Sequence, residues 1–427
     1  MKPISLMPLI ILLIQILLIT TGCKQTTEPK LEPELKLELE DVSCTEAWIN
    51  LRATNLQLPA NVTLYKNSVA QNNILCYGDT LLYVDSLLPN QTYKFKSIVQ
   101  SSNQQIITSS NELTVTTMDT TSHEFTWQSW EFGQHSSSTL YDVAIIDENN
   151  IWAVGEIYML DSLGRPDPNA YNAVHWDGTK WELKKIGGIG GWACHTVFAF
   201  SSNDIWFEGN IHWNGSTYTA YMNGWPLMPN GDGWQVNKMW GSSSSDLYAV
   251  GNNGNIAHYQ NGSWTKIESG TTSILNDVWG IKNELNRTIV YCAASSFFVP
   301  GDKKILKITD AKVDSVNWNR DVRLYSAWTN NDNFLYVCGE GVFVNKFRTW
   351  SEINLQQVGT NSIRGNKLND IFIAGDYGFK SHFNGLTWQV YNNNYLKGYS
   401  RLSFQGNIVA IAGNYQGKAT VEIGRRN

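Results

Sequence analysis

The residues most able to do chemistry here are seven histidines, because imidazole binds metal ions and exchanges protons near neutral pH. Four of them occupy one position of a repeated sequence pattern: His175, His212, His258 and His382. Equivalent positions of successive repeats are spread apart in a repetitive fold, so these side chains are expected to be structural. The spacing of zinc ligands is also missing among the remaining three, which are His123, His135 and His195. The sequence predicts no metal site and no cofactor.

Aspartates at turn positions are the second group that could take part in a reaction. Asp204, Asp246 and Asp370 each open an apolar run after a Ser or an Asn, and residues of this type bond to nearby backbone groups. A glycoside hydrolase needs two carboxylates flanking one bond, and no pair stands out. We therefore predict no catalytic residue, and a hydrolase acting on carbohydrate is kept as an alternative.

Two cysteines in the N-terminal part, Cys44 and Cys76, could form a disulfide in an oxidising compartment. Two buried free thiols are an equal alternative, because sequence spacing does not show how far apart the Cα atoms lie. Cys292 and Cys338 fall one step out of register in neighbouring repeats, and we expect core thiols there.

Composition sets limits on the class of protein. The chain has 427 residues, a net charge of −6 and 16% charged residues, so two or three domains are expected. A nucleic-acid binder would need a basic face, and the slightly acidic balance argues against nucleic acid as a partner. Only one of the eighteen tryptophans, Trp48, lies before residue 121, which sets a tryptophan-rich C-terminal part apart from the rest.

Residues 1–22 have the pattern of a secretory signal. Leu9–Ile19 is apolar except for Gln15, and a spanning helix would need about 20 apolar residues. The segment ends in Thr20-Thr21-Gly22-Cys23, which resembles the lipobox of bacterial lipoproteins, with Thr20 in place of the usual aliphatic residue. An ordinary signal peptide is the alternative.

The lipobox resemblance implies that Cys23 is acylated and anchors the chain to a membrane. Residues 23–34 are polar and contain two prolines, so they are predicted to form a tether. Lys24 follows the cysteine where inner-membrane retention signals carry Asp, which by analogy favours the outer membrane of a bacterial cell envelope. The chain would then face the periplasm or the cell surface.

Residues 35–118 are predicted to form a small β-sandwich. Leu35, Leu37 and Leu39 alternate with charged residues, which is the period of a half-buried strand. Further short apolar runs are separated by turns rich in Asn, Gly and Ser. The pattern Leu87-x-Pro89-x-x-x-Tyr93 resembles the tyrosine corner of fibronectin type III domains. That resemblance implies a spacer or adhesion role.

Residues 121–427 repeat a segment that ends in a small residue. The small residues, about 43 positions apart on average, are Gly155, Gly209, Gly251, Ala294, Gly339, Gly375 and Gly413. This spacing predicts four strands per repeat and seven repeats, hence an all-β fold with a seven-bladed β-propeller. The last repeat lacks a fourth strand, and residues 125–132 resemble that strand, so we expect them to complete the last blade and close the ring.

Whole repeats resemble the Asp-box propellers of sialidase-like proteins and the propellers of photosystem assembly factors, which implies a fold rather than a reaction. Long loops often carry binding residues, and they gather on one predicted face of this propeller. The candidate ligand contacts on these loops are Trp192, Trp225, Trp234 and Phe298. The alternative is that these rings only pack the loops against the blades.

Together these features predict a lipid-anchored, non-catalytic binding protein of the cell envelope, with a glycan or a protein as its ligand. Two other functions stay open: an extracellular hydrolase acting on carbohydrate, and an assembly or scaffold factor of an envelope complex. Neither the ligand nor the oligomeric state follows from the sequence.

Overall fold

The computed structural model describes residues 31–101, 103–188, 191–226, 234–296, 302–391 and 394–427. The predicted signal peptide, Cys23 and most of the predicted tether lie outside these residues, as does Phe298. The described chain is built from strands, with only three single-turn 3-10 helices, which confirms the all-β class. It divides into two compact units, one holding β1–β8 and the other β9–β36.

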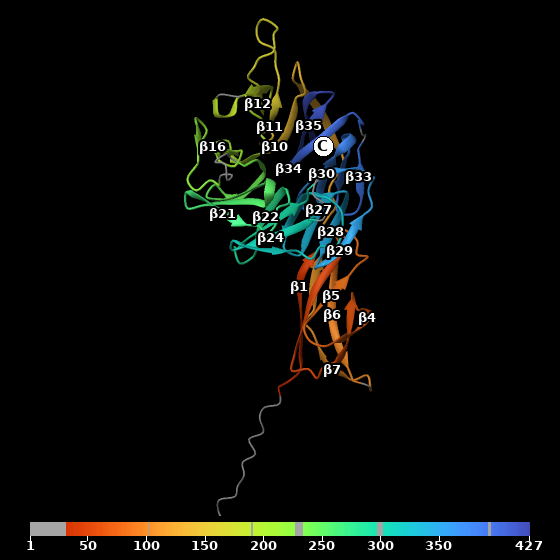
Figure 1. The fold of residues 1–427 in the computed structure, drawn as a ribbon. Helices are drawn as coiled ribbons and strands as arrows, with labels where there is room; N and C mark the ends of the chain where they lie inside the picture. Colours follow the sequence, from red (N-terminus) through yellow and green to blue (C-terminus); the bar gives the residue numbers. More distant parts are fainter. Residues whose placement is uncertain (1–30, 102, 189–190, 227–233, 297–301, 392–393) are drawn as a thin grey trace, which may run out of the picture. The chain divides into compact units, whose positions relative to one another are not determined.

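The first unit contains two antiparallel sheets (Figure 1). One sheet has the order β1-β2-β5, from β1 (Glu34–Val42), β2 (Ala47–Thr54) and β5 (Thr80–Val84). The other has the order β4-β3-β6-β7 with β8 also paired to β6, from β3 (Ala60–Lys66), β4 (Val69–Cys76), β6 (Thr92–Gln100), β7 (Ile106–Ser109) and β8 (Leu113–Thr116). Leu35 and Leu37 are buried, as their alternation predicts, whereas Leu39 is 42% exposed where a β-bulge begins.

The second unit contains seven four-stranded antiparallel sheets in a propeller-like arrangement, numbered here from 1 to 7 along the chain (Figure 1). Sheets 1 to 3 consist of β10 (Thr139–Asp147), β11 (Asn150–Ile157), β12 (Tyr171–Trp176) and β13 (Trp181–Lys184); β14 (Val197–Ser201), β15 (Asp204–Phe207), β16 (Ile211–Trp213) and β17 (Tyr218–Ala220); and β18 (Val236–Ser243), β19 (Asp246–Gly251), β20 (Asn255–Gln260) and β21 (Ser263–Glu268).

Sheets 4 to 7 follow in the same order. They consist of β22 (Leu275–Lys282), β23 (Thr288–Ala294), β24 (Lys304–Thr309) and β25 (Lys312–Ser315); β26 (Leu324–Asn331), β27 (Phe334–Gly339), β28 (Gly341–Lys346) and β29 (Thr349–Ile353); β30 (Thr360–Lys367), β31 (Asp370–Gly375), β32 (Lys380–Phe383) and β33 (Trp388–Val390); and β34 (Lys397–Gln405), β35 (Ile408–Tyr415), β36 (Lys418–Arg426) and β9 (Phe125–Phe132).

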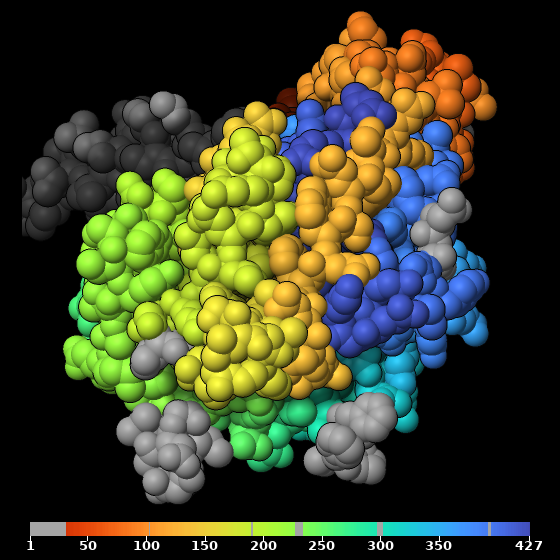
Figure 2. All heavy atoms as spheres, turned by 90° about the horizontal axis from the view of Figure 1, so that it is seen from above, coloured from red at the N-terminus to blue at the C-terminus, as the bar shows by residue number. Residues whose placement is uncertain are grey.

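Sheet 7 takes its fourth strand from the other end of the unit. β9 pairs antiparallel with β36, from Phe125 opposite Arg426 to Phe132 opposite Ala419. In Figure 2 the orange residues of this region lie beside the dark-blue C-terminal residues. The first strand of each sheet contacts the first strand of the next, and β34 contacts β10. The seven first strands therefore form a closed ring, which leaves no long sheet edge between the first and last sheets.

Apolar side chains fill the spaces between neighbouring sheets. Between sheets 7 and 1, for example, Val143 and Val174 pack with Ala412 and Val421, all buried. The repeated glycine has a steric reason at the second strand of the sheets. A Cβ atom on Gly339 would lie 1.9 Å from the carbonyl oxygen of Arg323, the residue before the first strand of sheet 5, so a side chain would push the two strands apart.

Candidate functional site

A β-bulge near the start of the first strand recurs around the ring. In six of the seven sheets the register between first and second strands skips one residue at this point, and a bulge aims the skipped side chain away from the regular pleat. The skipped residues are Tyr141, Asn237, Asn276, Tyr325, Asn361 and Ser400. All six line one cavity of about 560 Å³, together with His195, which comes just before the first strand of sheet 2. We call this cavity the mouth, and all seven sheets contribute to it.

The three asparagines of the mouth join neighbouring sheets. The side-chain Nδ2 atoms of Asn237, Asn276 and Asn361 donate to the carbonyl oxygens of Leu275, Leu324 and Tyr399, at 3.0, 2.9 and 2.8 Å. Each acceptor belongs to the next sheet, so the amides hold the ring together. Within the described chain no donor reaches the three Oδ1 atoms, which leaves three acceptors for a ligand.

Arg401 brings a positive charge to the mouth. Its guanidinium donates to the carbonyl oxygens of Asn361 at 2.9 Å and Asn276 at 2.7 Å, which belong to different sheets. Its Nε atom is buried and unpaired. No carboxylate of the described residues lies within ion-pair distance of it. The mouth therefore offers a cation, three amide oxygens and the rings of Tyr141 and Tyr325.

Two buried ion pairs, which we call the floor, are made by residues that follow the mouth residues on the first strands. The Lys238 ammonium lies 2.5 Å from an Asp142 oxygen, and Arg364 holds Asp277 through two bonds of 2.7 and 2.8 Å. Burial raises the pKa of the Asp277 carboxyl, but the Arg364 guanidinium outweighs it and lowers that pKa to about 2. Burial lowers the pKa of the Lys238 ammonium. The floor is thus charged but locally neutral.

A second, smaller cavity begins beyond this floor. Its volume is about 260 Å³, and Lys238 and Arg364 reach it from the floor. Its other walls are largely apolar, with Phe198, Met239 and Trp279 among them. The basic members of the two ion pairs therefore line a mainly apolar cavity that is distinct from the polar mouth.

Carboxylates beside the mouth are already bonded to protein groups. Glu156 accepts hydrogen bonds from the hydroxyls of Tyr141 at 2.7 Å and Tyr158 at 2.8 Å. Glu208 accepts from the backbone N–H of His195 and lies 3.4 Å from its ring Nδ1, which raises the pKa of that imidazole. His195 also stacks on Tyr141, with ring centroids 5.1 Å apart. This arrangement orders the rings of the mouth and engages both carboxylates in hydrogen bonds to protein groups.

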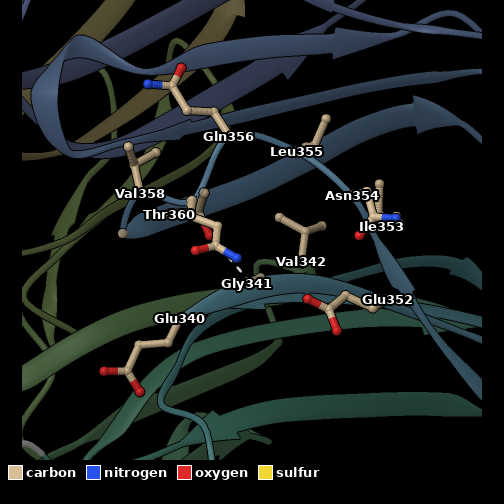
Figure 3. Close-up of a pocket in the computed structure, with 12 residues that line it drawn as sticks. Glu340, Gly341, Val342, Glu352, Ile353, Asn354, Leu355, Gln356, Val358 and Thr360 are labelled. Atoms are coloured by element: carbon tan, nitrogen blue, oxygen red, sulfur yellow. Dashed lines mark hydrogen bonds between the residues drawn. The ribbon is translucent and has the colours of Figure 1, made fainter.

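A groove lies next to the mouth between sheets 5 and 6 (Figure 3). Its volume is about 410 Å³, and it ends at Thr360, the residue before Asn361 of the mouth. Glu340 and Glu352 lie on one wall, and the connection from β29 to β30 forms the other. Both acids have basic partners: Arg323 lies 2.8 Å from Glu340, and Arg320 lies 3.8 Å from Glu352.

The tryptophans expected to contact a ligand are packed into the propeller. Trp225 and Trp234 are 8% and 6% exposed and stack on each other at 5.4 Å, while Trp192 is half-buried against the cluster between sheets 1 and 2. This packing favours the alternative in which the rings hold loops against the blades. Ligand contact by Trp192, Trp225 and Trp234 stays a prediction, and Phe298 lies outside the described residues.

The candidate disulfide is not formed in the structure. Cys44 and Cys76 are both buried free thiols. The Cys44 thiol donates to the Asp119 carbonyl oxygen at 3.2 Å, and burial raises its pKa to about 11. Cys76 ends β4, and burial raises the pKa of its thiol as well. Of the two alternatives, the structure has the free thiols.

A pairing of the repeated histidines with the turn aspartates was missed from the sequence. The ring Nε2 atoms of His212, His258 and His382 each lie 2.8 Å from a carboxylate of the same sheet, on Asp204, Asp246 and Asp370. The signal was present, because both residue types recur at fixed positions of the repeat. In the described part of the chain, no three His, Cys, Asp or Glu side chains come together as metal ligands.

Comparison with known proteins supports the fold. No protein-family model matches the sequence, and no curated protein matches it. The chain is similar to the solved structure of YCF48 bound to D1 peptide, at 16% identity with a TM-score of 0.51, covering 72% of this chain and 100% of that chain. It is also similar to YCF48 from Cyanidioschyzon merolae, at 13% identity and a TM-score of 0.48 over 70% and 98% of the two chains, and to the RRP9 WD40 repeats, at 7% identity and 0.49 over 71% and 100%.

At this level of identity the likeness shows the fold alone, a β-propeller, and agrees with the propeller-like arrangement of the sheets. Among the described residues, no helix has the length and hydropathy needed to cross a bilayer.

Proposed function

We propose that this chain is a lipid-anchored protein of a bacterial cell envelope whose propeller binds a glycan or a protein without catalysis. The observation that carries the proposal is the mouth, a polar cavity of about 560 Å³ to which every sheet contributes. Ligand sites commonly measure about 300–1,000 Å³ and use a few well-placed polar groups. The free amide oxygens, Arg401 and the ordered rings supply such groups.

Charge at the mouth favours binding over hydrolysis. A glycosidase acid is held protonated by a raised pKa, and each described carboxyl whose pKa departs clearly from its ordinary value has it lowered, as Asp277 does. Glu156 and Glu208 are committed to Tyr141, Tyr158 and His195. A ligand at the mouth would therefore meet hydrogen-bonding groups rather than a protonated carboxyl group.

The N-terminal segments supply the envelope part of the proposal. Acylation of Cys23 would tie the chain to the outer membrane, and residues 23–34 would act as the tether. The first unit would act as a spacer of the fibronectin type III kind, which its division into a sheet of β1-β2-β5 and a sheet around β3 and β6 supports. Replacing Cys23 with Ser is expected to abolish incorporation of a labelled palmitate and to release the chain from the membrane fraction.

The mouth is tested by filling it. Ser400 lines the cavity, and its hydroxyl makes no hydrogen bond to another described residue. Ser400→Trp places an indole in the mouth, and we expect it to weaken binding about tenfold or more. Binding is measured on a glycan array and on a phage-displayed library of 12-residue peptides, with the purified chain beginning at Lys24.

A matched control uses the opposite face of the propeller. Leu285 is 75% exposed on the connection between β22 and β23, which joins a first strand to a second. Leu285→Trp should leave binding unchanged. Ligands that both variants bind as well as the wild type would contradict the mouth as the binding site, and turnover of a bound glycan would instead support the hydrolase.

A further inference from the structure

Two loops on the mouth face share one backbone conformation but differ in one side chain. Gly251–Asn255 connects β19 to β20, and Gly375–Phe379 connects β31 to β32. Asn253 has φ 58° and ψ 30°, and Tyr377, at the same place in the second loop, has φ 56° and ψ 30°. The first loop therefore serves as an internal reference for the second.

The left-handed backbone conformation costs less free energy for Asn than for Tyr. Asn is one of the few residues with a side chain that adopts it routinely, because its short amide bonds to the local backbone. A bulky residue held there is an outlier that the rest of the structure must support. Tyr377 is therefore the less stable choice for a loop that elsewhere in the same chain uses Asn.

Packing does not compensate for this conformation. The Tyr377 side chain is 55% exposed. Within the described chain it takes part in no hydrogen bond and no ring contact. The backbone geometry that the two loops share requires glycine only at Gly375 and Gly378 in the second loop, because a Cβ atom on either would strike backbone atoms. A strained and exposed aromatic side chain with no internal partner is what a contact surface requires.

Other exposed apolar side chains adjoin Tyr377. A Cβ on Gly378 would lie 2.6 Å from the Asn394 carbonyl oxygen, so this loop packs on the turn that precedes β34. That turn carries Tyr395 and Leu396, which are 69% and 59% exposed. We call Tyr377, Tyr395 and Leu396 the Tyr377 platform. Two exposed tyrosines on neighbouring turns suit a protein contact, because tyrosine is enriched in interface hot spots.

One carboxylate beside the platform, that of Asp376, has no basic partner among the described residues. It accepts a hydrogen bond from the Asn361 amide at 2.9 Å. A carboxylate next to exposed tyrosine faces attracts a cationic side chain by charge and by cation–π contact. The net charge of −6 on the chain would also favour approach of a basic partner.

We propose that the Tyr377 platform binds a protein partner through a segment bearing Lys or Arg, with the cationic group between the tyrosine rings and Asp376. This rests on the proposed binding function and names the class of ligand for the same face. The platform adjoins the mouth through Asp376 and Asn361, which are hydrogen-bonded to each other, and the Arg401 cation of the mouth would keep the basic group of the partner on the platform side.

The decisive variant is Tyr377→Asn, which restores the residue found in the reference loop. Because the strain is relieved, the thermal unfolding midpoint of the propeller should rise by about 1–3 °C. Binding should fall about tenfold or more, because the central contact is lost. The matched control, Asn253→Tyr, introduces the same strain in the other loop and should lower the midpoint while leaving binding unchanged.

The probe is a phage-displayed library of 12-residue peptides selected on the full chain beginning at Lys24, and each recovered peptide is then measured on the Tyr377→Asn variant. We expect the recovered peptides to be enriched in Lys and Arg, to lose affinity for Tyr377→Asn, and to bind more weakly as salt rises. Enrichment of acidic or uncharged peptides, or a glycan whose binding is lost in Tyr377→Asn, would overturn the basic protein segment as the ligand. A lowered unfolding midpoint in Tyr377→Asn would overturn it too, because it would show a packing role.

The same experiments separate this inference from the proposed function. Peptides that Ser400→Trp loses and Tyr377→Asn keeps would overturn the platform and leave the mouth as the binding site. Peptides that bind equally well to both variants would contradict both.

Discussion

Removal of the Arg364 guanidinium offers the sharpest test of how the floor of the mouth is held. Asp277 is fully buried and is held by two bonds from Arg364. Arg364→Met keeps an unbranched apolar side chain but leaves the carboxylate without its main partner. Breaking a buried ion pair from one side costs about 3–5 kcal/mol. We expect a loss of that size in the free energy of unfolding at pH 7.

The pH dependence of the free energy of unfolding gives a second measure of what the Asp277–Arg364 pair contributes. The Asp277 pKa is lowered from 3.8 to about 2, which corresponds to about 2.5 kcal/mol of stability from this one group. The folded pKa is depressed, so this stability is present above about pH 4 and is lost as the pH falls toward 2. Without Arg364, burial dominates and the folded pKa lies above its unfolded value. The variant should therefore regain stability as the pH falls from 7 to 5, by about 1 kcal/mol or more relative to wild type.

The assay is urea unfolding at pH 7 and pH 5, followed by tryptophan fluorescence, because nearly all tryptophans lie in the propeller. Asp277→Asn combined with Arg364→Met should be less destabilised than Arg364→Met alone, since no charge is left unpaired. The exposed pair Lys312–Asp314 is the control, where Lys312→Met should cost less than about 1 kcal/mol. A loss below 1 kcal/mol in Arg364→Met, or an equal loss at both pH values, would refute this account of the floor.

Three further predictions concern a glycine contact, a buried histidine and the strand that closes the ring. Gly339→Ala should destabilise the propeller by about 3 kcal/mol, because its Cβ would lie 1.9 Å from a carbonyl oxygen, whereas Gly398→Ala, whose nearest neighbour is 3.5 Å away, should change it little in the same urea titration. Burial of His123 against His382 lowers its pKa to about 4, so stability should fall as the pH drops from 6.5 toward 4, and His123→Gln should flatten that slope; an unchanged slope would contradict the assignment. Deleting residues 1–133 removes β9 and bares the edge of β36, so the remaining chain should aggregate in size-exclusion chromatography, and a monomeric, fully folded product would contradict closure by that strand.

The repeat was readable in the sequence because it reflects a local rule. Where Gly339 meets the Arg323 carbonyl, and Gly155 meets the Thr139 carbonyl, only a residue without a side chain fits. The same contact recurs in five of the seven repeats, while Gly209 and Ala294 hold the position in the other two. The recurring small residue thus predicts the four-stranded sheets that the structure has in a propeller-like arrangement. The Asp–His pairs could have been found the same way, since Asp246 and His258 hold fixed positions in one repeat.

The mouth was not predicted from the sequence, because its six bulge residues are of three types. Asn237, Asn276 and Asn361 share this position of the repeat, whereas Tyr or Ser holds it in the other three sheets that have the bulge. Only closure of the ring brings them together. The tryptophans are frequent and regular, and Trp225 and Trp234 are buried, because a large ring stabilises a loop best when it is packed. Ligand contact by these two rings stays a prediction.

Some residues of the mouth stabilise the ring, whereas others are available only for ligand binding. Asn276 ties sheet 4 to sheet 5 through its Nδ2 atom and offers only its oxygen to a ligand, so a change of residue there would cost stability as well as binding. Ser400 sits at the corresponding bulge of sheet 7, where its hydroxyl bonds to no other described residue. Since the charged floor is neutralised by its own ion pairs, positions like Ser400 can change the ligand without disturbing the ring. Ligand specificity would then be set at bulge positions such as Ser400 and at Tyr377, whose backbone has a left-handed conformation. The asparagine amides, which hold the sheets together, would contribute less to specificity.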